Sequence, residues 1–238
     1  MPHPESGRRT GPALRVGGLT PLTTIDYPGE LAAVVFCQGC PWRCRYCQNT
    51  DLLPGRGRNE LPWERVLELL ERRRGLLDAV VFSGGEPTLQ AALADAIKQV
   101  KALGYKTGLH SAGIYPNRLE RVLPELDWVG LDIKALPENY PAITGIEGSG
   151  EGAWDSARRL IATGVAHEIR LTIHPFLLPP ERVEEMLQRL DAMGADRVVL
   201  QPCRTAHGLD PSLHSLPTAD LEPYRPLSEA HPSLSFRV

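Results

Sequence analysis

The chain lacks several features that would define its setting. It has no run of about eighteen apolar residues, so no segment is predicted to span a membrane. Residues 1–10 are polar, and no apolar core of a signal peptide follows them. Basic residues do not predominate, since 26 lysines and arginines stand against 29 acidic residues, which argues against nucleic-acid binding. We therefore expect a cytoplasmic protein that binds neither membrane nor nucleic acid.

Cysteine is also scarce, and it is unevenly placed. Five cysteines occur, and Cys40, Cys44 and Cys47 lie close together as C-x3-C-x2-C. Cysteines stay reduced in the cytoplasm, so this crowding indicates a metal site rather than a disulfide framework. Three thiolates are one fewer than a four-cysteine iron–sulfur cluster requires, which leaves a coordination position vacant.

The other two cysteines leave alternatives open. Cys37 extends the pattern to C-x2-C-x3-C-x2-C, which a zinc knuckle or a four-cysteine electron-transfer cluster also uses. Zinc pairs are usually separated by a dozen or more residues, so the tight spacing counts against zinc. Cys37 ends an apolar run, where a cysteine is more often a small buried hydrophobe, and we interpret Cys203 as a packing residue too.

Short apolar runs alternate with amphipathic segments along most of the chain. Strands are predicted at residues 31–36, 79–82, 105–109, 128–133, 168–173 and 197–200. Helices are predicted at residues 63–73, 89–103, 117–123, 153–163 and 180–193, with a possible short helix at 219–224. The alternation predicts an α/β fold with a parallel sheet and outer helices.

The arrangement that we predict is a partial (β/α)6 TIM-like barrel, although a doubly wound open sheet fits the alternation almost as well. We expect residues 1–17 to be a flexible segment, with hairpin-like structure up to about residue 29. Residues 18–238 are predicted to form a single domain.

Two further motifs follow predicted strands. Gly84 and Gly85 allow the backbone to approach a ligand closely, and Glu86 can accept a hydrogen bond from an ammonium group. An ordinary turn ahead of a helix explains the same residues. Asp132 and Lys134 fall on one side of a strand by period-two alternation, either as a structural ion pair or as a lining of the barrel interior.

The cysteine motif after the first of these strands, with Gly-Gly-Glu-Pro after the second, resembles the radical S-adenosylmethionine (SAM) superfamily. The resemblance implies that Cys40, Cys44 and Cys47 hold a [4Fe-4S] cluster whose open iron binds SAM, within a partial barrel of the radical SAM type. Together with Lys134 these cysteines form the implied catalytic set. The implied cofactor-binding positions are Tyr46 beside the adenine, Gln48, Gly84, Gly85, Glu86, Asp132, Lys134 and Arg204 near the ribose.

Some positions depart from the pattern of pyruvate formate-lyase activase-like members. Gln48 replaces a histidine after the last cysteine. Residues 110–113 read His-Ser-Ala-Gly in place of Asp-Thr-Asn-Gly, so a cation site built on that aspartate is in doubt. His174 fits either a proton relay or a histidine at the rim of the barrel, and we favour the second.

Residues 18–29 and 36–40 most resemble activating proteins of anaerobic ribonucleoside-triphosphate reductase. The implied activity is that of a radical SAM oxidoreductase: reductive cleavage of SAM to a 5′-deoxyadenosyl radical, which removes a hydrogen atom from a glycine of a partner glycyl radical enzyme. A flavodoxin- or ferredoxin-type protein would supply the electron. The alternatives are a radical SAM enzyme acting on a small molecule or another peptide, and a non-catalytic iron–sulfur electron-transfer protein.

Overall fold

The computed structural model describes residues 12–237. Residues 1–11 of the predicted flexible segment 1–17 therefore lie outside the described residues. In the remainder of that segment Leu14 and Val16 are buried, and the first strand begins at Val16.

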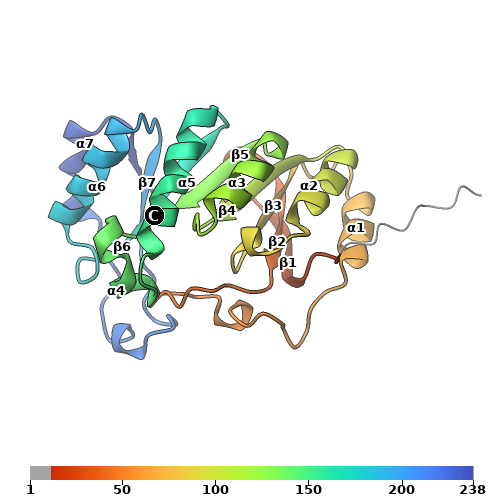
Figure 1. The fold of residues 1–238 in the computed structure, drawn as a ribbon, viewed down its shortest axis with the longest axis horizontal. Coiled ribbons are helices and arrows are strands. Elements are labelled where there is room, and N and C mark those ends of the chain that lie inside the picture. The colour runs from red at the N-terminus through yellow and green to blue at the C-terminus, as the bar shows by residue number, and fades with distance from the viewer. Residues whose placement is uncertain (1–11, 238) are drawn as a thin grey trace, which may run out of the picture.

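One eight-stranded sheet organises the described residues, with its strands in chain order from β1 to β8 (Figure 1). β1 is antiparallel to β2, and every later pair is parallel. The strands are β1 Val16–Thr23, β2 Ala32–Cys37, β3 Ala79–Gly84, β4 Lys106–Ser111, β5 Trp128–Asp132, β6 His167–Ile173, β7 Val198–Pro202 and β8 Leu234–Phe236. The six predicted strands are β2 to β7. β1 and β8 form the two edges, so the sheet is an open partial barrel.

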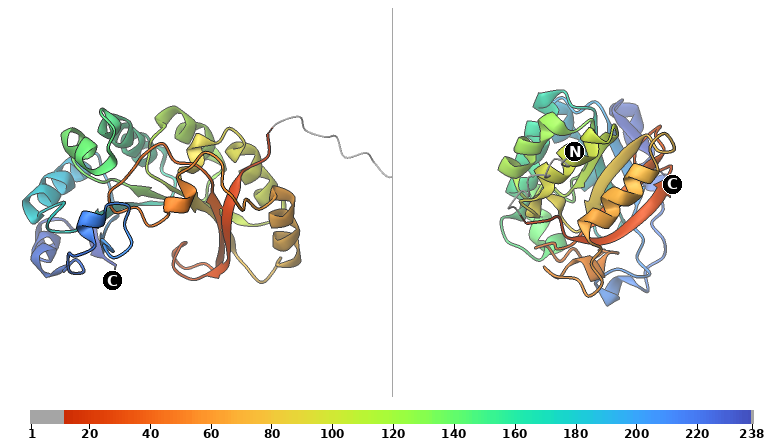
Figure 2. Two further views of the ribbon diagram at one scale, coloured as in Figure 1. Left: turned by 90° about the horizontal axis from the view of Figure 1, so that it is seen from below. Right: turned by 90° about the vertical axis from the view of Figure 1, so that its right-hand side faces the viewer.

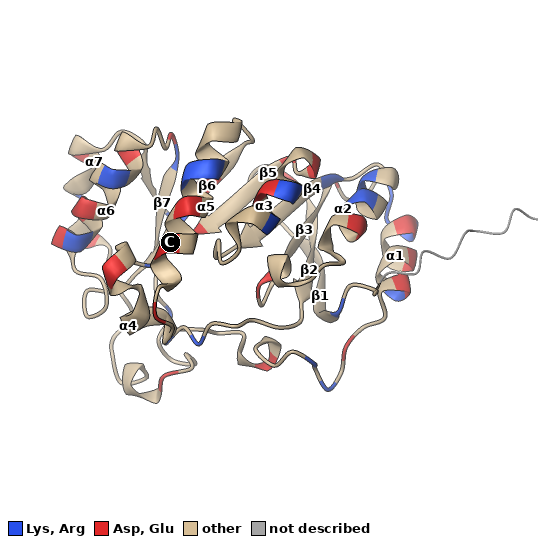
Figure 3. Ribbon diagram, viewed as in Figure 1, with Lys and Arg blue, Asp and Glu red and all other residues tan. Residues whose placement is uncertain are grey.

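Helices lie along one side of the curved sheet (Figure 2). They are α1 Trp63–Arg72, α2 Leu93–Ala102, α3 Pro116–Val122, α4 Tyr140–Thr144, α5 Ser149–Thr163, α6 Pro180–Ala192 and α7 Leu227–Ala230. The five predicted helices are α1, α2, α3, α5 and α6. Acidic and basic residues are interspersed along α1, α3 and α6 (Figure 3). No helix among the described residues is long and apolar enough to cross a membrane.

The structure differs from the predicted elements in three places. The predicted helix 89–103 begins only at Leu93, because Glu86 accepts a hydrogen bond from the backbone N–H of Thr88 and caps a separate 3-10 turn. The tail prediction was incomplete: residues 222–224 form a 3-10 turn, followed by α7 and β8. α4 was not predicted, because five residues with a proline at the second position show no helical period.

The two faces of the sheet are packed differently. The helix-covered face carries the main core, with residues such as Val35, Phe82 and Leu171 fully buried. On the opposite, inner face a small apolar cluster covers the amino-terminal ends of several strands. There Tyr27, from the turn between β1 and β2, packs on Trp128 with ring centroids 5.2 Å apart. The inner face is thus filled at the amino ends of the strands.

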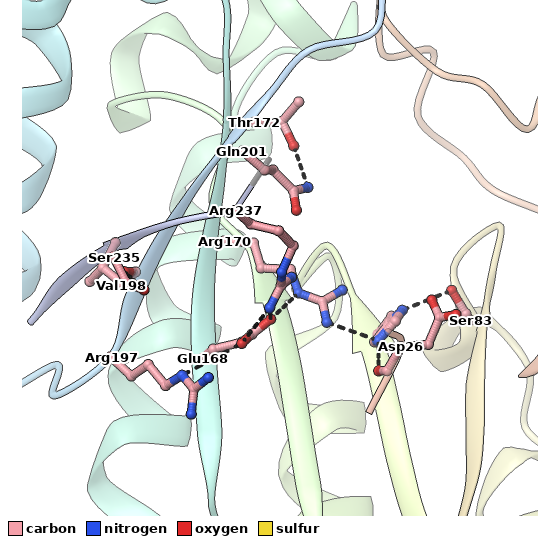
Figure 4. Close-up of polar contacts among 11 residues, drawn as sticks. Asp26, Ser83, Glu168, Arg170, Thr172, Arg197, Val198, Gln201, Ser235 and Arg237 are labelled. Atoms are coloured by element: carbon pink, nitrogen blue, oxygen red, sulfur yellow. Dashed lines mark hydrogen bonds and ion pairs between the residues drawn. The ribbon is translucent and has the colours of Figure 1, made fainter. Parts of the chain in front are cut away.

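Farther across the inner face lies a charged network centred on Glu168 of β6 (Figure 4). The Glu168 side chain is fully buried and accepts hydrogen bonds from Nε of Arg170 at 2.7 Å and from Nη2 of Arg237 at 2.8 and 2.9 Å. Burial by itself would raise the pKa of this carboxyl. The two arginines outweigh burial and hold the pKa below its usual value.

Replacing Glu168 with glutamine should therefore lower the free energy of unfolding by roughly 2–3 kcal/mol at pH 7, because Arg170 stays buried without its counter-charge. A carboxyl with a depressed folded-state pKa stabilises the fold fully above its unfolded pKa of about 4.3 and loses this effect as the pH falls through the folded value. Thermal unfolding followed by circular dichroism should show a wild-type advantage that shrinks below about pH 4. Exposed Glu64→Gln on α1 is the matched control. An equal loss at pH 7 in both variants would contradict the assigned role of Glu168.

Candidate functional site

The carboxyl ends of the parallel strands meet at one edge of the sheet, and the cysteine loop emerges there from β2. Its base is closed by two backbone hydrogen bonds. Gly39 N donates to Leu52 O at 2.8 Å, and Cys40 N donates to Leu53 O at 3.2 Å. The loop that carries the three cysteines is therefore tied down where it leaves and where it returns.

The middle of the loop is anchored by α4 and by a later segment. Arg43 N donates to Thr144 O at 3.0 Å, and Arg45 N donates to Ile143 O at 2.9 Å, both at the end of α4. The Arg45 guanidinium also pairs with Asp210 at 2.7 Å. α4, which no sequence pattern predicted, thus supports the loop directly.

The three thiols of the loop are all partly buried, whereas Cys37 and Cys203 are buried in the core. Burial raises the pKa of the Cys40 thiol to about 12 and also raises the pKa of Cys44. These two thiols are thus protonated at neutral pH when no metal is bound, and a metal must displace their protons in order to bind.

The Gly-Gly-Glu turn after β3 is fastened to the start of the cysteine loop. Gly85 N donates to Cys37 O at 2.9 Å, and Glu86 N donates to Gly39 O at 2.9 Å. Gly84 has φ +107°, a conformation that favours glycine. A Cβ atom on Gly85 would lie 2.3 Å from Gly39 O, so the two backbones are packed with no room for a side chain.

Glu86 is fully buried, and both of its carboxylate oxygens are engaged within the protein. Oε1 accepts from Thr88 N at 3.1 Å, Thr88 Oγ1 at 2.5 Å and Ser111 Oγ at 2.8 Å, and Oε2 accepts from Ala112 N at 2.9 Å. Burial raises the pKa of Glu86, and these donors oppose that rise. Glu86 therefore joins the turn to the end of β4, and its contact with a cofactor ammonium stays a prediction.

Asp132 and Lys134 lie at the carboxyl end of β5 and form an ion pair of 3.4 Å. Lys134 Nζ also lies 5.5 Å from the centroid of the Tyr46 ring. Burial alone would lower the pKa of Lys134, but Tyr46, Asp132 and Cys44 outweigh it and raise the pKa well above its usual value. Lys134 is thus positively charged beside the cysteine loop.

The structure brings two of the weaker candidates together. Gln48 Nε2 donates to the backbone carbonyl of Arg204 at 2.8 Å, while the Arg204 side chain is exposed. His174 uses both ring nitrogens on backbone groups: Nδ1 accepts from Phe176 N at 3.1 Å, and Nε2 lies 3.1 Å from Pro217 O. His174 therefore holds the segment around residue 217 against the end of β6, as expected for a structural histidine at the rim.

The donor set fits an iron–sulfur cluster with a bound organic cofactor. Among the described residues, no group of three or more His, Cys, Asp or Glu side chains is arranged to hold a single metal ion. The three cysteines are instead spread along one anchored loop, and thiolates suit iron–sulfur clusters. The buried Tyr46 hydroxyl has no hydrogen-bond partner among the described residues, and such a group is costly unless a bound molecule satisfies it.

A mostly parallel α/β sheet with three clustered cysteines at its carboxyl edge indicates a protein of the iron–sulfur class. Residues 34–193 match the model of the Radical SAM superfamily. The chain belongs to this superfamily, and it is an enzyme that uses a [4Fe-4S] cluster and SAM.

Individual relatives agree with this assignment. The chain is 33% identical over 200 residues to the pyruvate formate-lyase-activating enzyme of Clostridium pasteurianum, covering 80% of this chain and 82% of that protein. QueE from Escherichia coli has a similar fold, with a TM-score of 0.57 at 16% identity over 94% of each chain. Streptococcus suis SuiB bound to S-adenosylmethionine is similar over 84% of this chain, with a TM-score of 0.63 at 15% identity. The chain spans 48% of the SuiB chain.

Sequence reasoning missed the residues that hold the motifs in place. Ser111 belongs to the His-Ser-Ala-Gly segment that we noted only as a departure from relatives, yet its hydroxyl fixes Glu86. Tyr140 of α4 accepts a hydrogen bond from Lys134 N at 2.9 Å. Ser111 could have been found from its place at the end of a strand beside β3, whereas nothing in the pattern around Tyr140 indicated its role.

Gly85→Ala should separate the Gly-Gly-Glu turn from the cysteine loop, because the new Cβ meets the rigid backbone of Gly39. We expect iron bound per chain after reconstitution to fall at least severalfold, with a matching loss of SAM binding. Gly55→Ala is the control, because a Cβ there meets nothing within 4 Å. Full iron loading and SAM affinity in Gly85→Ala would show that the close contact is dispensable.

Proposed function

We propose that this chain is an activating enzyme that installs a glycyl radical on a partner enzyme, most specifically on anaerobic ribonucleotide reductase. The main support for the proposal is that backbone hydrogen bonds join the start of the cysteine loop to the Gly-Gly-Glu turn. That arrangement supports a cluster site beside backbone groups at the carboxyl-terminal edge of the partial barrel. The Clostridium pasteurianum relative, named as an activating enzyme, supports the same class.

Each residue has a distinct part in this proposal. Cys40, Cys44 and Cys47 would hold the cluster, and bound cluster and SAM together supply reductive cleavage to methionine and a 5′-deoxyadenosyl radical. Lys134 and Asp132, as a charged pair beside Tyr46, would orient the polar groups of the cofactor. The remaining sheet and loops would limit the access of water to the reacting atoms.

Two partners compete for the glycine that receives the radical. Pyruvate formate-lyase is favoured by the name of the Clostridium pasteurianum relative. Anaerobic ribonucleotide reductase is favoured by the resemblance of residues 18–29, which in this structure form much of β1 and the turn that packs Tyr27 onto Trp128. We prefer the reductase because of that resemblance in the residues of β1 and the following turn. A flavodoxin- or ferredoxin-type protein is the proposed electron donor.

The chemistry is tested by changing one cysteine of the loop. Cys44→Ala should lose cluster binding and reduce 5′-deoxyadenosine formation under dithionite to background. Cys203→Ala is the matched control, because this cysteine is buried in the core and should leave cleavage close to wild type. If reconstituted wild-type protein forms no 5′-deoxyadenosine, the enzymatic proposal fails.

The partner is tested by mixing the reduced enzyme and SAM with each candidate separately. Anaerobic ribonucleotide reductase should develop the doublet of a glycyl radical in electron paramagnetic resonance, and pyruvate formate-lyase should develop much less. A strong signal with pyruvate formate-lyase alone would reverse the choice of partner but keep the class of enzyme.

A further inference from the structure

The inner face of β6 presents polar side chains at every second position. Ile169 and Leu171 point into the helix-covered core, so by alternation Glu168, Arg170 and Thr172 face the other way. Arg237, the residue after β8, reaches the same face, where Figure 4 shows it paired with Glu168. The proposed reaction does not use this group of residues.

Positive charge exceeds negative charge in this group. Arg170 and Arg237 hydrogen-bond the single Glu168 carboxylate, and Arg197 Nε lies 3.6 Å from it. The neighbouring ring of His110 is held neutral, because burial and the charge of Arg170 lower its pKa well below the usual value. Three guanidinium groups therefore share one carboxylate, which leaves a surplus of two positive charges.

Several guanidinium N–H groups remain without an acceptor. His110 Nε2 lies 2.8 Å from the carbonyl of Asp26 and 3.0 Å from Arg170 Nη2. A carbonyl can only accept, so Nε2 carries the hydrogen and cannot accept from Arg170. The described residues also offer no hydrogen bond to Nη1 of Arg170, or to Nε and Nη1 of Arg237. Arg170 is only 8% exposed, yet its nitrogens are not among the buried, unpartnered polar atoms of the described residues, so the unused donors still reach solvent.

The group lies on the same inner face as Asp132, and the Arg170 guanidinium stacks 5.2 Å from the centroid of the Trp128 ring. Arg170 is the register partner of Asp132, whose side chain pairs with Lys134. Gly130 leaves the space that the Arg170 guanidinium occupies, since a Cβ there would lie 2.7 Å from its central carbon. Arg197 and Arg237 lie toward the open edge formed by β8, with side chains 52% and 33% exposed.

We propose that Arg170, Arg197 and Arg237 form an anion-binding strip that receives a side-chain carboxylate of the protein segment carrying the target glycine. This inference rests on the proposed function and adds to it a charge preference for the substrate. A carboxylate matches the planar fork of a guanidinium and can accept two hydrogen bonds from it. Glu168 fixes the orientation of the arginines, while the incoming carboxylate neutralises part of their surplus charge.

The test uses the cluster-loaded enzyme and short fluorescein-labelled peptides with a central glycine. In a series of peptides, a single aspartate occupies each of the other positions in turn. Each peptide is compared with one that carries asparagine at the same position. Anaerobic fluorescence anisotropy should show one aspartate position that binds about tenfold tighter than its counterpart, as expected for one charge-assisted contact. Higher ionic strength should reduce that ratio, because Arg197 and Arg237 are partly exposed.

Arg197→Gln should reduce the ratio severalfold, and Arg237→Gln should bring it close to one. Loss of the Arg237–Glu168 pair can loosen β8 in the Arg237→Gln variant. Arg197 is half exposed, so Arg197→Gln should fold normally and still tests the strip. Arg72→Gln, an exposed arginine at the end of α1, is the matched control and should keep the wild-type ratio.

Three results would contradict the proposed strip. No aspartate peptide binds more tightly than its asparagine counterpart, or the preference for aspartate is unchanged in both Arg197→Gln and Arg237→Gln. The third is that inorganic phosphate binds while the peptides show no preference. 5′-Deoxyadenosine formation is measured separately on the wild-type enzyme. Its absence would refute the proposed function, whereas the binding ratio would still report on the strip.

Discussion

The contact between Gly85 and Gly39 is the constraint on which the site depends. Two backbone segments, one from the turn after β3 and one from the start of the cysteine loop, touch with no side chain between them. Parallel strands make this contact possible, because neighbouring strands end at the same edge. Glu86 then connects the turn to β4, so three successive strand ends are joined into one unit.

One part of the inner face of the sheet is packed with apolar side chains, and another part carries polar and charged side chains. At the amino ends of the strands, Tyr27 and Trp128 fill the space, and the neighbouring Ala32 and Val34 are fully buried. Toward the carboxyl ends the same face turns polar, with Asp132 on β5 and Arg170 on β6 in register. The Arg170 guanidinium lies 5.2 Å from the Trp128 ring centroid, so the polar part of the inner face, on which the proposed substrate segment would lie, directly borders the apolar cluster.

Much of the fold could be predicted from the sequence, because β2 to β7 are short apolar runs and five helices show a clear period. The three-cysteine and Gly-Gly-Glu motifs were also expected at the carboxyl ends of strands, and they follow β2 and β3 there. α4 and β8 could not be predicted, since they are too short for any period to emerge. The partners of Glu86 and Glu168 could not be predicted either. Several of them lie far along the chain, such as Ser111 for Glu86 and Arg237, 69 residues from Glu168, and only the folded backbone brings these together.

The pairing of Arg237 with Glu168 also bears on the order in which the molecule assembles. A ribosome makes β6 well before Arg237, so during synthesis the Glu168 carboxylate has only Arg170 and then Arg197 as counter-charges. β8 can pair with β7 only after it has been synthesised, and Arg237 then completes the ion-pair network around Glu168. The β8 edge of the sheet is thus completed only when the strands before it have been made.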